Sequence, residues 1–365
     1  MSVVFHCYEL LLLRKVAQNI KLWHELKERA LKGEHLYTAG EIPPDLWYLA
    51  ITISETKDRF WDFVRREVTQ EVLTYKRNGE TLLSKYLNMY AFVELHLDSI
   101  FQYGEVAVLP RELFKCPNVR HLSLKYNYLE TIPPDIGRLT KLEHLALTNN
   151  KLQNNSIPFT LTYCTRLNTL LLDNNLLDAL PGFLLQIPSL QTVHRHGNHN
   201  YFKATFMWYH TDVNDRILFV ENSTHQQCQI VPHSLQFLAA KTVIASKINF
   251  FECVEVAQML KDYISDSYSN FNLCANCNTA KLHNEPGYKV FTFKNPYLGN
   301  TCVPFQHWAC CMECAESIEI PARVEQIMAS MEQDRQYDLY VKESQVRSNH
   351  RQRDGTDFNF GCIIL

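Results

Sequence analysis

The stretch that decides the fold begins at Val119 and reads VRHLSLKYNYLETIP as far as Pro133. Its pattern, LxxLxLxxNxL, returns from Leu142 (LEHLALTNNKL), from Leu167 (LNTLLLDNNLL) and from Leu190 (LQTVHRHGN). Four copies of one pattern in a row indicate one structural unit that is repeated and stacked. The apolar residues that share a register are separated by 23, 25 and 23 positions, and they are Leu122, Leu145, Leu170 and Val193.

The spacing inside one copy has a mechanical interpretation. Leu122 and Leu124 alternate along a short strand, and both point into the core. Pro133 and Pro181 start the return segments. One copy cannot bury its apolar face alone, so the copies stack and their strands line a concave surface. This is the pattern of leucine-rich repeats, and it predicts an α/β solenoid. An asparagine turns each coil and can bond to neighbouring backbone, so we expect a ladder of Asn127, Asn150, Asn175 and Asn198.

The two ends of the repeats depart from the pattern, and we assign the repeats to residues 91–200. A weaker copy starts at Phe92, with Ile100 where the asparagine should be. In the last copy Arg195 occupies an apolar core position, so we expect the solenoid to end there. Three nearby histidines could suggest a metal, but no cysteine or acidic ligand accompanies them. We therefore interpret them as a polar edge of the concave surface, and they are His194, His196 and His199.

Residues 1–90 are predicted to be mainly helical. Glu9 to Lys32 and Thr56 to Tyr90 carry apolar residues at helical spacing, and Pro43 and Pro44 separate the two segments. A solenoid needs its first apolar face covered, so we expect an N-terminal helical cap. A partner-binding helix is the alternative.

Length, composition and charge limit the number of domains and the classes of function to consider. The 365 residues predict two to three domains, and 46% hydrophobic with 21% charged residues is typical of a globular protein. A net charge of −3 gives no broad electrostatic reason to bind nucleic acid. The opening segment lacks a basic start and a small-residue cleavage site, so we expect no secretory signal and a cytoplasmic protein. In a reducing compartment the 12 cysteines are poor candidates for disulfides.

The segment after the repeats, 201–270, is predicted to close the solenoid and then to form a helix. Residues 201–228 contain β-prone stretches, whereas Val231 to Lys247 reads VPHSLQFLAAKTVIASK, with Pro232 suited to a first helical turn. The spacing S-L-x-x-x-A-x-x-x-V places three of its residues on one helix face. The residues of this motif are Ser234, Leu235, Ala239 and Val243.

This helix resembles the elongin BC box, through which substrate receptors dock onto elongin C. The order of repeats, this helix and paired cysteines over residues 119–320 is similar to a small family of leucine-rich-repeat substrate receptors of cullin–elongin ubiquitin ligases. The resemblance implies that Leu235 fills a pocket of elongin C, a helix-in-groove contact. Such receptors carry a cullin-selecting segment with a Leu-Pro or Ile-Pro start, whereas Glu252 to Ile264 contains no proline. The alternative is a helix packed against the end of the solenoid.

Residues 271–320 form a cysteine-rich module. Two CxxC pairs are separated by 33 residues, and a β-like run extends from Tyr288 to Phe293 between them. Such pairs can place four thiolates around one structural zinc ion, in a zinc-ribbon-like module. We expect the ligands to be Cys274, Cys277, Cys311 and Cys314, with Cys302, His307 and Cys310 as possible replacements.

Other interpretations of the cysteines are weaker. A catalytic RING needs a further CxxC pair, and only Cys362 follows Cys314. A redox CxxC would need a βαβ context and no second pair. Merely buried cysteines would not explain the paired spacing.

Residues 321–365 are predicted to hold a helix and a flexible tail that begins at Ser344. The terminal CIIL has the C-a-a-X form associated with geranylgeranylation of Cys362. Such a lipid gives reversible membrane attachment. A chance tetrapeptide is the alternative.

Together these features favour a substrate receptor that is not an enzyme. No phosphate-binding glycine loop, GxSxG or HExxH motif is present. We expect elongin C and a cullin as partners, together with a protein recruited on the concave surface. The rival hypothesis is a prenylated leucine-rich-repeat scaffold in small-GTPase-type signalling. Side chains expected on the concave surface are His121, Ser123, Lys125, Tyr126, His144, Thr148, Thr169 and Asp173.

Overall fold

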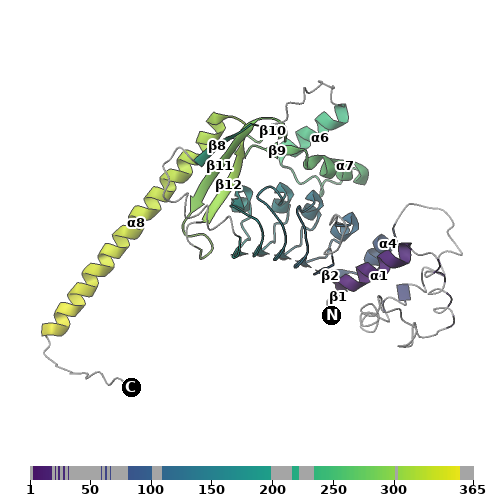
Figure 1. Cartoon of the computed structure of the whole chain (residues 1–365), viewed down its shortest axis with the longest axis horizontal. Coiled ribbons are helices and arrows are strands. Elements are labelled where there is room, and N and C mark those ends of the chain that lie inside the picture. The colour runs from purple at the N-terminus through teal and green to yellow at the C-terminus, as the bar shows by residue number, and fades with distance from the viewer. Residues whose placement is uncertain are drawn as a thin grey trace, which may run out of the picture.

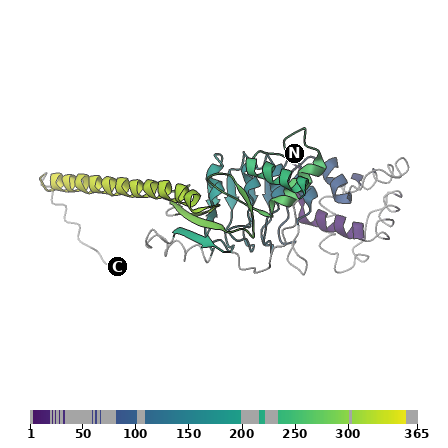
Figure 2. The same ribbon diagram turned by 90° about the horizontal axis from the view of Figure 1, so that it is seen from above.

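The fold is seen in a computed structural model of the chain (Figures 1 and 2). The residues that it describes are 3–18, 81–100, 109–198, 216–221, 234–300 and 303–353, with the single positions 21, 24, 28, 32, 59, 62, 63 and 66.

A parallel sheet of six strands forms one face of the solenoid, along the lower edge of Figure 1. Neighbouring strands pair in the register predicted from the repeat, and the central apolar residue of each is buried. These residues are Leu95, Leu122, Leu145, Leu170 and Val193. The strands in spatial order are β1 (Val3–His6), β2 (Phe92–His96), β3 (His121–Ser123), β4 (His144–Ala146), β5 (Thr169–Leu171) and β7 (Thr192–His194).

The predicted asparagine ladder is present between the coils. The Nδ2 atom of Asn150 donates to Leu124 O (3.0 Å) in the preceding coil and to Leu147 O (2.9 Å) in its own. Its Oδ1 atom accepts a hydrogen bond from Leu129 N (3.1 Å). A buried amide thus satisfies backbone groups that no strand pairing reaches. The same role is repeated by the buried side chains Asn127, Asn175 and Asn198.

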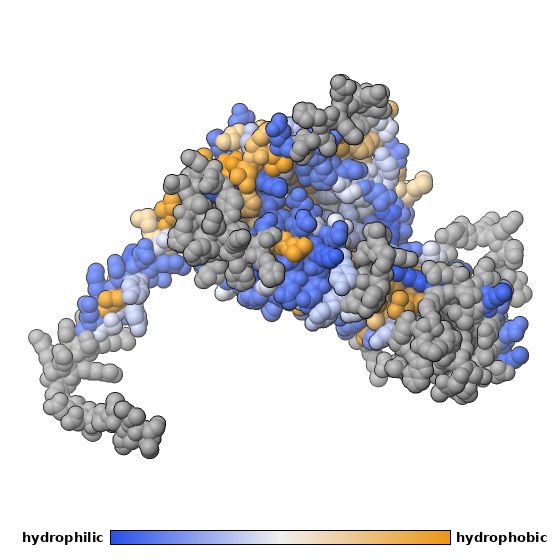
Figure 3. All heavy atoms as spheres, in the orientation of Figure 1, coloured by the Kyte–Doolittle hydropathy of each residue, from blue (hydrophilic) through white to orange (hydrophobic). Residues whose placement is uncertain are grey.

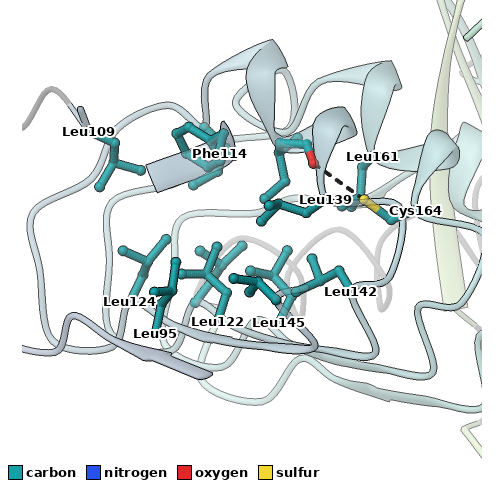
Figure 4. Close-up of a cluster of buried hydrophobic side chains, with 14 of the residues drawn as sticks. Leu95, Leu109, Phe114, Leu122, Leu124, Leu139, Leu142, Leu145, Leu161 and Cys164 are labelled. Carbon is teal, nitrogen blue, oxygen red and sulfur yellow. Dashed lines mark hydrogen bonds between the residues drawn. The ribbon is translucent and has the colours of Figure 1, made fainter. Parts of the chain in front are cut away.

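The outer face of the solenoid is built from short 3-10 turns. Each turn follows a proline in extended conformation, as expected for Pro133 and Pro181. Leucines from the strands and from the return segments meet between the two faces, and Cys164 Sγ lies 3.4 Å from Ile136 O (Figure 4). The turns are η2 (Arg111–Lys115), η3 (Pro134–Arg138), η4 (Phe159–Tyr163) and η5 (Gly182–Gln186).

The N-terminal end differs in part from the predicted helical cap. Val3–His6 form β1, which pairs with β2 and extends the sheet, because the apolar VVF run buries Phe5 in the core of the first coils. Helix α1 (Cys7–Gln18) begins two residues before the first predicted helical segment, and helix α4 (Leu82–Met89) lies within the second. Between them, buried Glu9 accepts hydrogen bonds from the Tyr86 hydroxyl (2.9 Å) and from Arg59. The rest of the predicted helices lies outside the described residues.

The C-terminal part packs on the outer face of the solenoid (Figure 1). Two helices, α6 (Leu235–Ser246) and α7 (Gln258–Tyr268), precede a hairpin of β9 (Phe271–Leu273) and β10 (Ala280–Leu282). A second sheet has the order β6, β12, β11, β8. Its strand β6 (Leu180–Pro181) belongs to the repeats and pairs with β12 (Val303–Ala309), so the second sheet is continuous with the solenoid. The other two strands are β8 (Ile217–Val220) and β11 (Gly287–Lys294).

Several predicted boundaries shift in this part of the chain. The helix expected from Val231 begins at Leu235, and Pro232 lies outside the described residues. Helix α8 (Met312–Arg353) continues through the segment predicted to be flexible from Ser344. Since that segment lacks glycine up to Arg353, nothing in its sequence interrupts the helix. Helix α8 projects from the body (Figure 2), and Cys362 lies outside the described residues.

Apolar side chains remain at the surface near the base of α8. Figure 3 shows orange surface in the region of β8, β11 and the first turns of α8. Exposed apolar residues of these elements include Leu218, Phe219 and Ile320. None of the helices in the described ranges is long and apolar enough to cross a membrane.

We predict that Asn150→Ala destabilises the solenoid by about 3 kcal/mol, because three buried backbone hydrogen bonds lose their partner. Urea unfolding followed by circular dichroism measures the change in free energy. The control is Gln191→Ala, which removes an exposed amide from the same solenoid and should change the free energy by less than about 0.5 kcal/mol. Equal losses in the two variants would show that the ladder contributes little.

Candidate functional site

Helix α6 is fixed at both ends by local sequence. The hydroxyl of Ser234 caps its first turn by accepting a hydrogen bond from Phe237 N (3.2 Å). Lys247 ends it in the left-handed conformation, with φ 56°. On its inner side Ala240 and Ile244 are buried in the core shared with α7 and the β9–β10 hairpin. This packing determines which side chains of α6 face the solvent.

The outer side of α6 carries the predicted motif and faces away from the molecule. Leu235 is 85% exposed, Ala239 is exposed and Val243 is half-buried. Because these three residues are four positions apart, they form one stripe along the helix. Val243 also packs against the core under α6, so the part of the stripe that another protein can reach is Leu235 and Ala239.

Further exposed apolar residues lie in the segment that follows α6. Ile248 follows α6, Val254 lies in the connection to α7, and Met259 and Leu260 lie in the first turn of α7. Val254 is 91% exposed and Met259 is 78% exposed, so neither side chain contributes to the core. Several exposed apolar side chains in one short segment are typical of an interaction site. We call these four residues and Leu235 the adaptor surface.

A network of charges fixes α7 to the outer turns of the solenoid. Asp135 in η3 is buried and accepts hydrogen bonds from Arg111 Nε (3.1 Å), from Arg138 Nε (2.7 Å) and from Ser265 Oγ (2.8 Å) of α7. Arg138 also binds Asp262 of α7. Since these contacts join two segments far apart in sequence, they hold the adaptor surface in a fixed position on the solenoid.

Asp262 is the second acidic residue of this network. Partial burial raises its pKa, but the hydrogen bond from Gln258 and the charges of Arg138 and Lys115 outweigh that effect, and the net pKa is lowered. Asp262 therefore stays ionised and paired when α7 is docked. This network cannot be predicted from the sequence, because isolated charged residues carry no pattern that reveals their distant partners.

Four cysteine sulfurs meet at the junction of the hairpin, β12 and α8. Their Sγ atoms all lie within 4.8 Å of one another. Tetrahedral zinc with Zn–S bonds of about 2.3 Å places its sulfurs about 3.8 Å apart. The distance between Cys310 Sγ and Cys314 Sγ is 3.8 Å, and Cys277 Sγ lies 3.4 Å from Cys310 Sγ. The group can hold a metal ion, and its members are Cys274, Cys277, Cys310 and Cys314.

The structure brings Cys310, and not Cys311, together with the other three predicted ligands. Cys310 follows the last residue of β12, Cys314 lies in the first turn of α8, and the short connection between these elements brings the two sulfurs together. Cys311 lies outside this group, although its sulfur is 3.9 Å from that of Cys310. Cys302 lies outside the described residues.

His307 is not close to this group. Its Nε2 atom lies 2.9 Å from Thr292 Oγ1, and its ring packs directly against Gly182. Burial lowers the pKa of His307 to about 4, so the ring is neutral and part of the contact between β12 and the solenoid.

The turn that holds the first two cysteines has a specific backbone. Thr279 O accepts from Cys274 N (2.9 Å), and Cys274 O accepts from Asn278 N (3.1 Å). Asn278 adopts φ 62°, a conformation that asparagine tolerates better than most residues. The hydroxyl of Thr279 lies 3.1 Å from Cys277 Sγ and lowers the pKa of that thiol to about 6, which favours the thiolate that a metal requires.

The residues predicted for the concave surface lie on or beside the strands and are at least partly accessible. His121 and His144 stack with ring centroids 4.4 Å apart. Asp173 accepts a hydrogen bond from His196 N (2.7 Å) and lies 3.8 Å from His194 Nδ1. This surface lies on the opposite side of the solenoid from α6 and the cysteines (Figure 1). The repeats therefore separate two accessible surfaces.

We predict that Asp135→Ala releases α7 from the solenoid and destabilises the protein by about 3 kcal/mol, because Arg138 loses a buried partner. Hydrogen exchange should increase in α6 and α7 and change little in β3–β5. Asp266→Ala, which removes an exposed carboxylate from the rim of the network, is the control and should have little effect. Unchanged exchange in α7 of Asp135→Ala would contradict this role.

Comparison with known proteins identifies the repeats. Residues 102–152 match the family model described as leucine rich repeat. Over 69 residues the chain is 44% identical to mouse (Mus musculus) podocan, a match that covers 18% of this chain and 11% of podocan. Over 78 residues it is 31% identical to the human (Homo sapiens) PH domain leucine-rich repeat-containing protein phosphatase 1, covering 21% of this chain and 4% of that protein.

Two solved structures are similar to about a third of the chain. A leucine-rich-repeat protein of Leptospira interrogans is 26% identical with a TM-score of 0.28, over 33% of this chain and 29% of that one. The leucine-rich-repeat ectodomain of an Arabidopsis thaliana receptor kinase is 24% identical with a TM-score of 0.26, over 32% and 61%. This chain spans only a small part of the curated relatives. The family match and the observed register together make the central part of the chain a leucine-rich-repeat solenoid, a module for protein interaction.

Proposed function

We propose that the protein is a non-catalytic substrate receptor, which recruits another protein on its strand face and docks through α6 onto elongin C of a cullin ubiquitin ligase. The observation that carries this proposal is the 85% exposure of Leu235 on a helix whose opposite side is firmly packed. An apolar side chain of this size contributes about 2 kcal/mol when it enters a partner's pocket. Ala239, next on the same stripe, leaves room for the partner's backbone to approach.

We assign the residues of the adaptor surface that follow α6 to contact with the cullin. In receptors that this chain resembles, the cullin-selecting segment follows the elongin-binding helix, which corresponds here to Glu252 to Ile264. This segment lacks the proline of those receptors, but it exposes Val254 before α7 and Met259 in the first turn of α7. Docked α7 holds them in place through Asp262 and Ser265. The proposed cullin contact is thus positioned by the solenoid itself.

The arrangement of the two surfaces suits a receptor. The strand face and the adaptor surface lie on opposite sides of the repeats, so a recruited protein and a ligase can be bound at once (Figure 1). The exposed strand-face residues mix histidine, hydroxyl and acidic groups, as a surface for a folded protein or a peptide does.

The cysteine group is proposed to hold one structural zinc ion. Four thiolates would fill its coordination, so the ion would stabilise the fold and leave no position for a substrate. Ala275 N donates to Trp308 O (2.9 Å), which joins the Cys274–Cys277 turn to β12. Zinc would therefore fasten the β9–β10 hairpin, on which α6 packs, to β12 and α8.

The alternative proposal is a prenylated scaffold attached to a membrane through Cys362. It rests on the terminal CIIL of the sequence. It is compatible with the receptor proposal, since a receptor can carry a lipid. Replacing Cys362 with serine should move the protein from the membrane to the soluble fraction of cells and leave elongin binding intact.

We predict that the purified protein binds the elongin B–elongin C dimer and that Leu235→Asp weakens this binding at least about 30-fold, because a charge would enter an apolar pocket. Calorimetric titration measures the affinity. Leu339→Asp, an exposed leucine of α8, is the matched control and should bind like the unaltered protein. If the unaltered protein does not bind elongins, or if Leu235→Asp binds equally well, the proposal fails.

We predict that the dialysed protein retains about one zinc ion per chain and that Cys274→Ser and Cys310→Ser each lose it. Cys311→Ser should retain the ion, since Cys311 lies outside the sulfur group. Elemental analysis and thermal unfolding with and without a chelator measure both effects. Loss of zinc from Cys311→Ser and its retention in Cys310→Ser would reverse the assignment.

A further inference from the structure

We propose that the strand face holds a second metal site, separate from the cysteine group, in which His121, Glu143 and His144 bind a divalent transition-metal ion such as Zn²⁺. Ring nitrogens of the two histidines and a carboxylate oxygen of Glu143 lie within 4.8 Å of one another. All three side chains are half-buried at the surface of the sheet, so an ion can reach them from solvent.

The solenoid register brings these ligands together. His121 of β3 and His144 of β4 are direct cross-strand partners, and Leu122 and Leu145 beside them are locked in the core. The two rings stack with centroids 4.4 Å apart and planes inclined by 13°. Side chains that project in parallel from neighbouring strands keep their ring nitrogens close without any loop rearrangement.

The donor set decides the class of metal. Two imidazole nitrogens and one carboxylate oxygen suit Zn²⁺, Ni²⁺ or Cu²⁺, whereas Mg²⁺ and Ca²⁺ prefer oxygen ligands alone. Zinc bonds of about 2.0–2.1 Å require nitrogens closer together than parallel rings provide, so the rings must tilt toward the ion. Half-exposed side chains can make this adjustment at small cost. Three protein ligands leave a position open toward the strand face, for water or for a donor from another molecule.

The charges around the site are compatible with a cation. Glu94 of β2 lies directly across from His121 and adds negative charge, and its carboxylate also contacts His96 Nε2 (3.1 Å). Arg120 is the positive charge that competes with a cation, because it donates a hydrogen bond to Glu143 Oε1 (3.3 Å). A carboxylate has a second oxygen, so Glu143 can bind Arg120 and the ion together.

The test uses the full chain with the cysteine group already loaded with zinc. Calorimetric titration with Zn²⁺ should show one further ion per chain, and His121→Gln and His144→Gln should each weaken its binding at least tenfold. His194→Gln, on the same face beside Asp173, is the matched control and should bind normally. Co²⁺ added in place of Zn²⁺ should give visible absorption without the intense thiolate charge-transfer band, which separates this site from the cysteines.

A second measurement does not depend on any variant. In the unaltered protein Zn²⁺ should shift the imidazole NMR signals of His121 and His144 and leave those of His194 and His196 in place. Absence of a further binding event would overturn the proposal. Binding that survives both substitutions, or shifts confined to other histidines, would do the same.

Discussion

The stacking of coils depends on one constraint, which is that backbone groups buried between neighbouring repeats must find hydrogen-bond partners. The asparagine amides supply them, and each amide joins its own coil to the preceding one through bonds of about 3 Å such as Asn127 Nδ2 to Leu97 O. With these groups satisfied, the leucines of successive coils form one continuous buried core. The repeat determines the geometry of both accessible surfaces. The strands form the strand face, and the outer turns support the helices that carry the adaptor surface.

The outer turns do more than close the coils. Asp135 lies in η3 because the repeat requires a turn there, yet its carboxylate binds Ser265 of α7 and two arginines. A residue of the solenoid thereby orients a helix pair from the C-terminal part. The pairing of β6 with β12 fixes the cysteine module in the same way. The C-terminal elements therefore form one continuous structure with the repeats.

The sequence was sufficient where a periodic pattern acts locally. The register of Leu122 and the ladder through Asn127 followed from spacing alone, as did the stripe that begins at Leu235. Features that depend on tertiary contacts did not follow. The contact of Asp135 with Ser265 spans 130 positions, and the choice of Cys310 over its neighbour depends on where β12 ends. The short strand β1 was missed because its apolar run continues directly into a helix.

Receptor function requires the outer side of α6 to be the surface that another protein occupies. Hydrogen exchange of the full chain, measured with and without the elongin B–elongin C dimer, tests this most directly. We predict that added protection is confined to residues 234–260 and that the backbone amides of β3–β5 exchange as before. Protection on the strand face with none in α6, or no protection anywhere at saturating dimer, would contradict the account.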